Sequence, residues 1–482
     1  MKVAHRFAKN LFWLSSAQSF SLVLGFFTVV YIARALGDTA FGQISFAQAL
    51  LTYLLLITDF GFTTKAISLI AKDRDRTADL AGYISSLRLL LSLMAVAGTV
   101  AGLWLMPGSG SKKLTILLFA LTVPLSVFDL GWIFAAHEKM RQVGLLQLFR
   151  AAIIFLLAVS ILPFNSHVQT VGVIYLAAYG LVAVLNVIWY RRNFGALRLR
   201  LSRRPIEQFL VQALPLGLSL FMIRIYYNSD TFILSYFHGD QVVGWYNAGY
   251  KIINVLIMIA GYYGAVLLPT LAHQITVSPK SAQMLMQQSF RILLVAALPI
   301  LICGIFFAND FMMMIFGASY VNGAVPFRLL LIATVIVFGG VTFTNALIAF
   351  EMQRTLLGLA SLAAVLNVGF NIILIPRLGM VGAALTTILA EAVVFTGGVW
   401  ALRTRVEMKF ITQTALKAIF AAIAMATTIW TLGSINKAIA LAGSFVIYII
   451  SLIVLGVLHR HDWAQLAIFV KSRQGRTVVS EP

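Results

Sequence analysis

Residues 11–33 read LFWLSSAQSFSLVLGFFTVVYIA, a stretch with no charged side chain. A transmembrane helix needs about 20 consecutive apolar residues, so the run from Leu11 to Ala33 is long enough to cross a bilayer. Basic residues precede it, as in a signal peptide, but the apolar core of a cleavable signal is only about 7–15 residues long. The stretch is therefore predicted to be an uncleaved first membrane-spanning helix.

The rest of the chain is also rich in apolar residues and poor in charged ones. Hydrophobic residues make up 60% and charged residues 11% of 482 positions, with a mean hydropathy of +0.93, whereas a soluble domain carries roughly 25% charged residues. The net charge of +20 comes mainly from basic residues between apolar runs. That pattern argues against nucleic acid and makes lipid headgroups the expected partner.

The fold class predicted from these runs is an all-α integral membrane protein with about 14 transmembrane helices. Connections between the runs are short, so successive helices are expected to be antiparallel neighbours. The runs lie near residues 11–34, 42–70, 80–106, 114–136, 142–163, 170–190, 209–237, 242–272, 284–307, 325–350, 356–376, 381–402, 411–432 and 438–458.

The distribution of Lys and Arg predicts the orientation of these helices. If the N-terminus is cytoplasmic, the inner segments hold 23 Lys and Arg and the outer segments hold 5. Cytoplasmic loops of membrane proteins are enriched in both residues. Both ends of the chain are therefore expected on the cytoplasmic side.

A short repeat divides the predicted helices into two lobes. The pattern Gly-Asp-x-x-x-Gly starts at Gly37 before the second span and again at Gly239 before the eighth. An offset of six helices preserves orientation, so the halves would be parallel repeats that enclose a cavity with alternating access. Two outer turns that both need glycine would give the same pattern. The predicted organisation is an N-lobe at 1–190, a basic cytoplasmic linker at 191–208, a C-lobe at 209–405, two further helices at 406–460 and a cytoplasmic tail at 461–482.

Signatures of catalysis are missing from the sequence. It has no Walker loop, no His-Glu-x-x-His zinc motif and no Gly-x-Ser-x-Gly elbow. The seven histidines are scattered at predicted helix ends and loops, and the single cysteine, Cys303, lies inside an apolar run. We expect neither an enzyme nor a metal site.

Charged side chains inside the predicted spans are the candidate functional residues. A charge at the bilayer centre costs roughly 2.5–3.5 kcal/mol on insertion scales, so each is expected to face a partner or a wet cavity. Cationic groups beside amides and hydroxyls would suit a phosphate or an acidic sugar. The candidate substrate-binding residues are Arg224, Lys251, Arg88, Arg150 and Arg291, and the intramembrane carboxylates are Asp59, Asp230 and Glu391.

Each of these charges has a second interpretation. An ion pair between two helices would bury a charge without any cavity, and the long side chains of Arg88, Arg150 and Arg291 could reach the inner interface. The three carboxylates are assigned either to such pairs or to coupling of transport to H⁺ or Na⁺. No cofactor is expected beyond that coupling ion.

Several motifs resemble a known family. The stretch TDFGF at residues 58–62, Asp230, the pair GD at 239–240 and the stretch GWYNA at 244–248 are similar to segments of Wzx-type polysaccharide transporters. These belong to the multidrug/oligosaccharidyl-lipid/polysaccharide exporter superfamily. The resemblance covers nearly the whole chain, including its length and predicted helix count.

The resemblance implies a function. Such proteins flip undecaprenyl-pyrophosphate-linked oligosaccharide repeat units across the bacterial inner membrane for O-antigen, capsule or exopolysaccharide synthesis. Two six-helix lobes enclose a cationic central cavity that opens alternately to each side. The partners implied are the lipid bilayer, the lipid-linked glycan and the polysaccharide polymerase with its chain-length machinery.

Two alternatives are weighed against it. A MATE-like drug/cation antiporter would want an acidic lumen, whereas basic residues lead here, and residues 11–33 lack the carboxylate that such antiporters often carry. Lipid II flippases typically have an Arg-Asp pair in that helix, which is also absent. A membrane glycan polymerase or ligase would need a long outer loop with catalytic residues, and the predicted outer loops are short.

Overall fold

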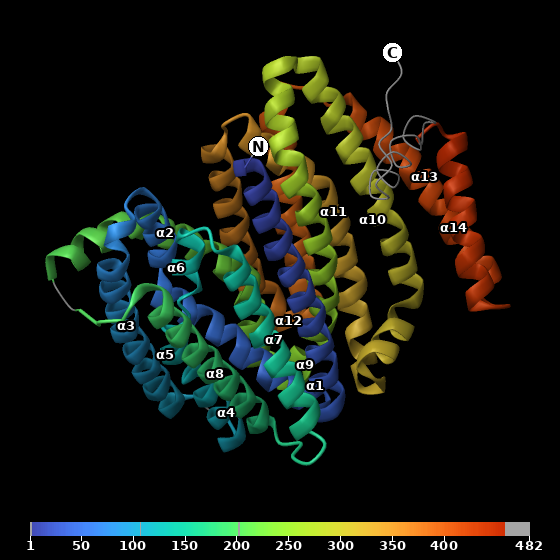
Figure 1. The fold of residues 1–482 in the computed structure, drawn as a ribbon. Coiled ribbons are helices and arrows are strands. Elements are labelled where there is room, and N and C mark those ends of the chain that lie inside the picture. Colours follow the sequence, from blue (N-terminus) through green and yellow to red (C-terminus); the bar gives the residue numbers. More distant parts are fainter. Residues whose placement is uncertain (1, 107, 201–202, 458–482) are drawn as a thin grey trace. The chain divides into compact units, whose positions relative to one another are not determined.

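The computed structural model describes residues 2–106, 108–200 and 203–457, with side chains placed for 13–106, 108–200, 217 and 228–457. This part of the chain is helical and contains no strand, as predicted. Its α-helices (Figure 1) are α1 Lys2–Asp59, α2 Phe62–Lys72, α3 Thr77–Leu105, α4 Gly110–Ala120, α5 Thr122–Ser126, α6 Gly131–Ala136, α7 Met140–Ile161, α8 Val168–Phe194, α9 Arg203–Val277, α10 Pro279–Phe316, α11 Ala324–Ala349, α12 Gln353–Leu402, α13 Lys409–Leu432 and α14 Lys437–Val454. Two short 3₁₀ helices lie between α-helices: η1 Arg74–Arg76 between α2 and α3, and η2 Ala318–Gly323 between α10 and α11.

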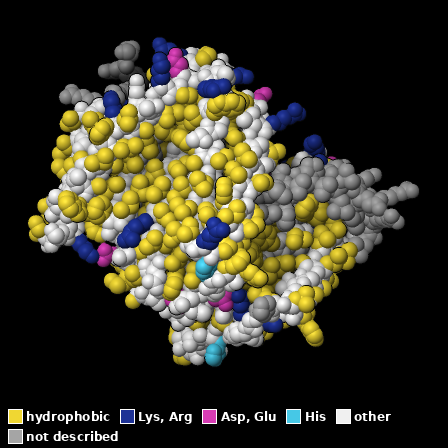
Figure 2. All heavy atoms as spheres, turned by 180° about the vertical axis from the view of Figure 1, so that it is seen from behind, with side chains coloured by type: hydrophobic (Ala, Val, Ile, Leu, Met, Phe, Trp, Pro, Cys, Tyr) yellow, Lys and Arg dark blue, Asp and Glu magenta, His cyan; other side chains and the backbone are white. Residues whose placement is uncertain are grey.

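Eleven helical segments among the described residues are long and apolar enough to cross a membrane. Large apolar side chains also cover their outside: Met94, Val266 and Trp430 are 62%, 71% and 75% exposed. Figure 2 shows a broad hydrophobic area on one face, with Lys and Arg side chains above and below it. A surface of this kind suits lipid, so the chain is a multi-pass membrane protein.

Three of the eleven segments are about twice the length of one crossing. They contain 47, 50 and 50 residues, and 50 helical residues extend about 75 Å against a hydrocarbon core of about 30 Å. Each is interrupted by a glycine with positive φ: Gly37 in α1 (φ 80°), Gly239 in α9 (φ 81°) and Gly379 in α12 (φ 55°). All three lie where the sequence predicts a turn between two spans.

The structure interrupts two of the predicted spans. In the run 42–70 the helix stops at Asp59, and Phe60 (φ 38°) and Gly61 (φ 82°) adopt left-handed conformations before α2 begins. The run 114–136 is divided into α4, α5 and α6, with residues 127–130 outside any helix. Pro124, which has no backbone N–H, lies in α5 just before this second break.

The chain folds into two compact units. Unit 1 comprises residues 1–251, 312–326 and 364–386, and unit 2 comprises 252–311, 327–363 and 387–482. The boundaries between these two units fall inside α9, α10, α11 and α12. The lobe boundary at 191–208 remains a prediction from the sequence.

In unit 1, α7 packs along α1, and α8 packs against both α4 and α7. Small residues allow the close approach: a Cβ on Gly144 of α7 would lie 2.8 Å from the Cβ of Ala17. At one end of unit 1, Arg200 pairs with Asp79, and Lys139 donates to Asn193 over 2.6 Å. These contacts join segments that the charge pattern assigns to the same side.

The two copies of the Gly-Asp repeat meet at the other end of unit 1. A Cβ on Gly42 would lie 1.7 Å from the carbonyl oxygen of Asp240, and a Cβ on Gly244 would lie 2.0 Å from the carbonyl oxygen of Asp38. Trp245 Nε1 donates to Asp38 Oδ2 over 2.8 Å. We call residues 37–42 and 239–245 the Gly-Asp clasp, since each copy of the repeat packs against the other through glycine.

In unit 2, α13 and α14 lie side by side (Figure 1). Its core includes Phe290 of α10, Phe343 of α11 and Tyr448 of α14, all nearly inaccessible. The Tyr448 hydroxyl donates to the carbonyl oxygen of Val295 over 2.9 Å, which satisfies the polar end of that buried ring.

Candidate functional site

Unit 1 contains a cavity of about 380 Å³ whose lining carries charges. Small-molecule sites commonly have volumes of about 300–1,000 Å³. Its walls come from α1, α2, α3, α5, α6, α7, α8 and the irregular segment 127–130. The lining residues with polar side chains are Asp59, Thr63, Arg88, Ser126, Asp129, Trp132, Gln147, Arg150 and Tyr179.

The helix break after α1 positions the first carboxylate. Asp59 is the last residue of α1, and the left-handed Phe60 and Gly61 turn the chain so that α2 starts beside it. Thr63 Oγ1, in the first turn of α2, donates to Asp59 Oδ2 over 2.9 Å. The TDFGF stretch therefore contributes Asp59 to the cavity wall.

Arg88 of α3 faces this carboxylate. Its Nε lies 3.4 Å from Asp59 Oδ1, and its Nη2 donates to the carbonyl oxygen of Ser126 over 3.4 Å. Arg88 is only 7% exposed. A guanidinium so deeply buried is stabilised when a carboxylate and a carbonyl face it, so this pair joins α1, α3 and the end of α5.

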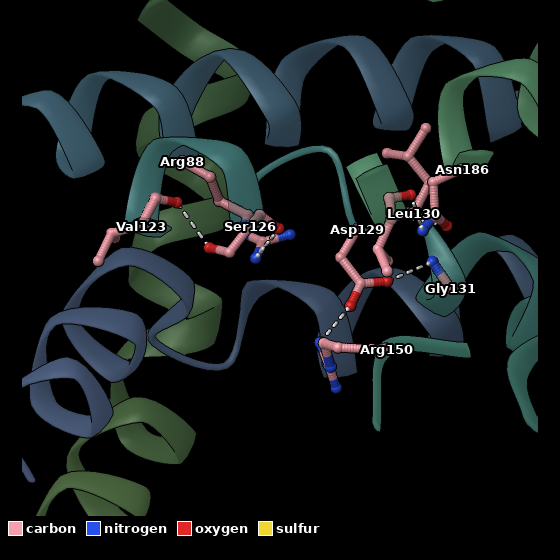
Figure 3. A network of polar contacts seen from close by, with 9 residues as sticks. Arg88, Val123, Ser126, Asp129, Leu130, Gly131, Arg150 and Asn186 are labelled. Atoms are coloured by element: carbon pink, nitrogen blue, oxygen red, sulfur yellow. Dashed lines mark hydrogen bonds and ion pairs between the residues drawn. The ribbon is translucent and has the colours of Figure 1, made fainter. Parts of the chain in front are cut away.

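The second break, at residues 127–130, positions another carboxylate (Figure 3). Asp129 Oδ1 accepts the backbone N–H of Gly131 over 3.3 Å, and the N–H of Leu130 is satisfied by Asn186 Oδ1 over 3.1 Å. Non-helical backbone at membrane depth is tolerated where it is buried in protein or lines a polar cavity. Both breaks in this unit border the same cavity.

Arg150 of α7 is the fourth charged residue that lines the cavity. Its Nη1 donates to Asp129 Oδ2 over 3.1 Å (Figure 3), and its guanidinium carbon lies 5.4 Å from the ring centre of Tyr179 on α8. The cavity thus contains two arginines and two aspartates, arranged as two ion pairs. Its formal charge is zero.

Lys251 is connected to the cavity wall through two neutral side chains. Its Nζ lies 3.5 Å from Gln48 Oε1, and Gln48 Nε2 donates to the hydroxyl of Tyr175 over 2.8 Å. Tyr175 and Tyr179 are four residues apart on α8 and share a helix face. Lys251 itself does not line the cavity.

Asp230 has a different environment from Asp59. It is 7% exposed, its Oδ2 accepts the Tyr246 hydroxyl over 2.7 Å, and its Oδ1 accepts the backbone N–H of Thr231 over 2.7 Å. No ion pair identified among the described residues includes Asp230. A phenol and an amide therefore hold this carboxyl group.

The remaining predicted residues lie elsewhere. The side chain of Arg224 is outside the described residues. Arg291 on α10 and Glu391 on α12 belong to unit 2, where both are partly buried. The structure therefore brings together Asp59, Arg88 and Arg150 from the predicted set.

Asp129 is the functional candidate that sequence reasoning missed. It lies inside the predicted span 114–136, so it should have been counted with the intramembrane charges. Pro124 and Gly131 on either side were the available signal, because helix-breaking residues around an intramembrane acid indicate irregular backbone beside a polar site.

Comparisons with known proteins place the chain in a family. Residues 7–274 match the model of a family described as polysaccharide biosynthesis protein. A protein of Escherichia coli K12 described as "Putative O-antigen transporter" is 23% identical over 254 residues, which cover 52% of this chain and 60% of that protein. An uncharacterized membrane protein of Methanocaldococcus jannaschii is 24% identical over 284 residues, or 57% of this chain and 55% of that one. The matched regions thus span just over half the length of these relatives.

Solved structures share the fold at low identity. The lipid II flippase MurJ in an inward closed conformation matches with a TM-score of 0.75 and 13% identity, covering 94% of this chain and 99% of that one. An inward-facing multidrug resistance transporter of the MATE family matches with a TM-score of 0.64 and 15% identity, covering 81% and 98%. The fold is therefore that of lipid flippases and MATE transporters.

Proposed function

Because the chain belongs to the polysaccharide biosynthesis protein family, we propose that it flips lipid-linked oligosaccharides across a membrane. The substrate is an undecaprenyl-pyrophosphate-linked repeat unit, and the membrane is the bacterial inner membrane. The glycan then serves O-antigen, capsule or exopolysaccharide synthesis, where a polymerase and its chain-length machinery are the partners. The protein acts as a transporter and carries out no covalent step.

The observation that carries this proposal is the polar cavity inside an apolar helical unit. A membrane protein that only needed stability would keep its helices continuous and its interior apolar. Here two helix breaks and four charged side chains border one cavity of about 380 Å³. A hydrophilic glycan needs such a polar environment at membrane depth.

The proposed topology has fourteen crossings with both ends in the cytoplasm. Two crossings for each of the three long, glycine-interrupted helices would raise eleven candidate segments to fourteen. Two ion pairs within unit 1 support the proposed alternation of loops between the two sides of the membrane. Asp79 pairs with Arg200, both on the cytoplasmic side, and Lys112 pairs with Asp240 of the Gly-Asp clasp, both on the outer side. Neither pair joins segments assigned to opposite sides.

The proposed mechanism is alternating access, with the Gly-Asp clasp as a closed outer contact. Two further contacts reinforce that end of unit 1. Arg34 Nε donates to the carbonyl oxygen of Ile315 over 2.7 Å, and the Tyr320 hydroxyl donates to the carbonyl oxygen of Ala33 over 2.9 Å. Opening toward the outside would require these contacts to separate.

Among the basic residues, Arg224 and Lys251 are proposed to contact the pyrophosphate or acidic sugars, with Arg291 on the inner approach. Arg224→Ala, expressed in a strain lacking the native gene, is expected to abolish surface glycan while membrane protein level stays normal. A phosphate contact of arginine is charge-assisted and bidentate, so alanine removes it completely. The readout is surface polysaccharide by gel and immunoblot.

A matched variant controls for loss of any arginine. Arg354→Ala changes an exposed side chain at the start of α12 and is expected to leave surface glycan at the wild-type level. Normal glycan in the Arg224→Ala strain would refute the role of Arg224. No glycan even with the wild-type gene restored would refute the proposed function.

A further inference from the structure

The charge balance of the cavity distinguishes it from an anion site. Each arginine already has a carboxylate: Arg88 Nε lies 3.4 Å from Asp59 Oδ1, and Arg150 Nη1 lies 3.1 Å from Asp129 Oδ2. A pyrophosphate or a uronic acid could bind these guanidinium groups only by displacing an aspartate that would stay nearby. Two like charges in a poorly solvated space repel each other strongly, so an anionic ligand is disfavoured here.

Three buried polar atoms of the cavity-lining residues make no hydrogen bond within the described chain. Arg88 Nε and Asp59 Oδ1 face each other 3.4 Å apart in their ion pair but make no hydrogen bond, and Trp132 Nε1 also makes none within the described chain. The first and third are donors and the second is an acceptor. A hydroxyl group donates and accepts at once, so a hydroxyl-rich neutral molecule could satisfy both kinds of atom.

The remaining lining residues fit the same ligand. Gln147 adds an amide, which both donates and accepts. Tyr179 and Trp132 add aromatic surface, against which the C–H face of a sugar ring can pack. Planar polar groups beside aromatic rings, in about 380 Å³, match one or two sugar rings better than a bulky or charged group.

We propose that this cavity is a subsite for a neutral sugar residue of the transported glycan, and that it discriminates against acidic sugars and pyrophosphate. The inference rests on the proposed flippase function and deepens it. In each ion pair the arginine donates hydrogen bonds and the aspartate accepts them, while their opposite charges cancel. The two pairs therefore favour a neutral ligand that can both donate and accept. The pyrophosphate must then bind elsewhere.

Ligand binding to the purified full-length protein in lipid nanodiscs tests the proposal. Saturation-transfer difference NMR would compare glucose, galactose and N-acetylglucosamine with glucuronate, galacturonate and inorganic pyrophosphate. At least one neutral sugar is expected to bind at least tenfold more tightly than either uronate or pyrophosphate. Equal or tighter binding of the anions, or no neutral-sugar binding at about 100 mM, would overturn it.

Changing the charge of the cavity should reverse this preference. Asp129→Asn leaves Arg150 without its carboxylate and is expected to improve glucuronate binding at least tenfold over wild type. Gln147→Lys adds a positive charge without breaking an ion pair, so it gives the same test in a variant whose pairs are intact. Unchanged selectivity in the folded variants would overturn the proposal.

Asp310→Asn is the matched control. It makes the same substitution in another ion pair, the one with Lys437 in unit 2, and is expected to leave sugar selectivity unchanged. Surface glycan measured in parallel separates the two claims. Wild-type protein that restores glycan but shows no neutral-sugar binding contradicts only the subsite, whereas failure to restore glycan contradicts the flippase function itself.

Discussion

Arg88 and Asp59 show how a charged residue is kept inside this membrane protein. The side chains are 9% and 26% exposed, and their charged atoms lie 3.4 Å apart. Breaking a buried pair by removing one partner typically costs about 3–5 kcal/mol, whereas replacing both with apolar residues is often neutral or stabilising. We therefore propose that the pair serves the chemistry of the cavity rather than stability.

A double-mutant cycle tests this view of the pair. Arg88→Met alone is expected to lower stability by about 3 kcal/mol, because Asp59 is left without its main partner. Arg88→Met combined with Asp59→Leu is expected to recover most of that loss and still impair glycan export. Unfolding in detergent and surface glycan are the two measurements. A double variant with normal export would show that the pair is only structural.

His137, between α6 and α7, gives the protein a pH-dependent contact outside the spans. Its Nε2 lies 2.9 Å from the hydroxyl of Thr77. Burial, followed by the nearby charges of Arg74 and Lys139, lowers the pKa of this imidazole. The folded protein therefore keeps His137 neutral at a pH where the unfolded chain, with a pKa of about 6.5, begins to bind a proton.

Stability is accordingly expected to fall as pH drops below about 6.5 and to level off below the folded pKa. His137→Gln keeps a polar side chain but cannot titrate, so it should flatten part of this decline. The check is the thermal unfolding midpoint between pH 7.5 and 5 for both proteins. Identical pH profiles would mean that His137 makes no contribution.

At the scale of elements, glycines decide where α1 and α9 turn and how closely they approach. Gly37 and Gly239 have nearly the same dihedral angles, with φ of 80° and 81° and ψ of 175° and 178°. This conformation is strained for any residue with a Cβ. The repeat detected in the sequence thus corresponds to one local geometry used twice, and the two copies contact each other.

Gly42→Ala is expected to disturb the Gly-Asp clasp, because its Cβ would lie 1.7 Å from the carbonyl oxygen of Asp240. Overpacking of this kind typically costs about 1–3 kcal/mol. Gly25→Ala is the matched control, since its Cβ would meet nothing within 4 Å in the same helix, and alanine favours the helix by up to about 1 kcal/mol. Thermal unfolding in detergent compares them; equal midpoints would contradict the close packing.

At the scale of the whole molecule, the intramembrane carboxylates bear on what drives transport. Asp59, Asp230 and Glu391 are proposed either to couple transport to H⁺ or Na⁺ or to act as structural partners. If they couple, an imposed ion gradient should accelerate flipping by wild-type protein in vesicles, and Asp230→Asn should lose that response, because the amide can neither ionise nor release a proton. Asp310→Asn should respond like wild type. Flipping that ignores both gradients would leave the carboxylates with structural roles.

Sequence alone determined that this is an all-helical membrane protein, because hydropathy and charge content fix the solvent in which a chain can fold. It also placed three turns between spans, two of them at the Gly-Asp repeat, and counted Asp59, Arg88 and Arg150 among the intramembrane charges. Only the tertiary structure decided that Arg150 pairs with Asp129 and that Arg88 faces Asp59. Hydropathy is a property of residues that are neighbours in sequence, whereas an ion pair depends on how helices distant in sequence are placed. Because that placement sets an aspartate beside each arginine, the cavity has no net formal charge.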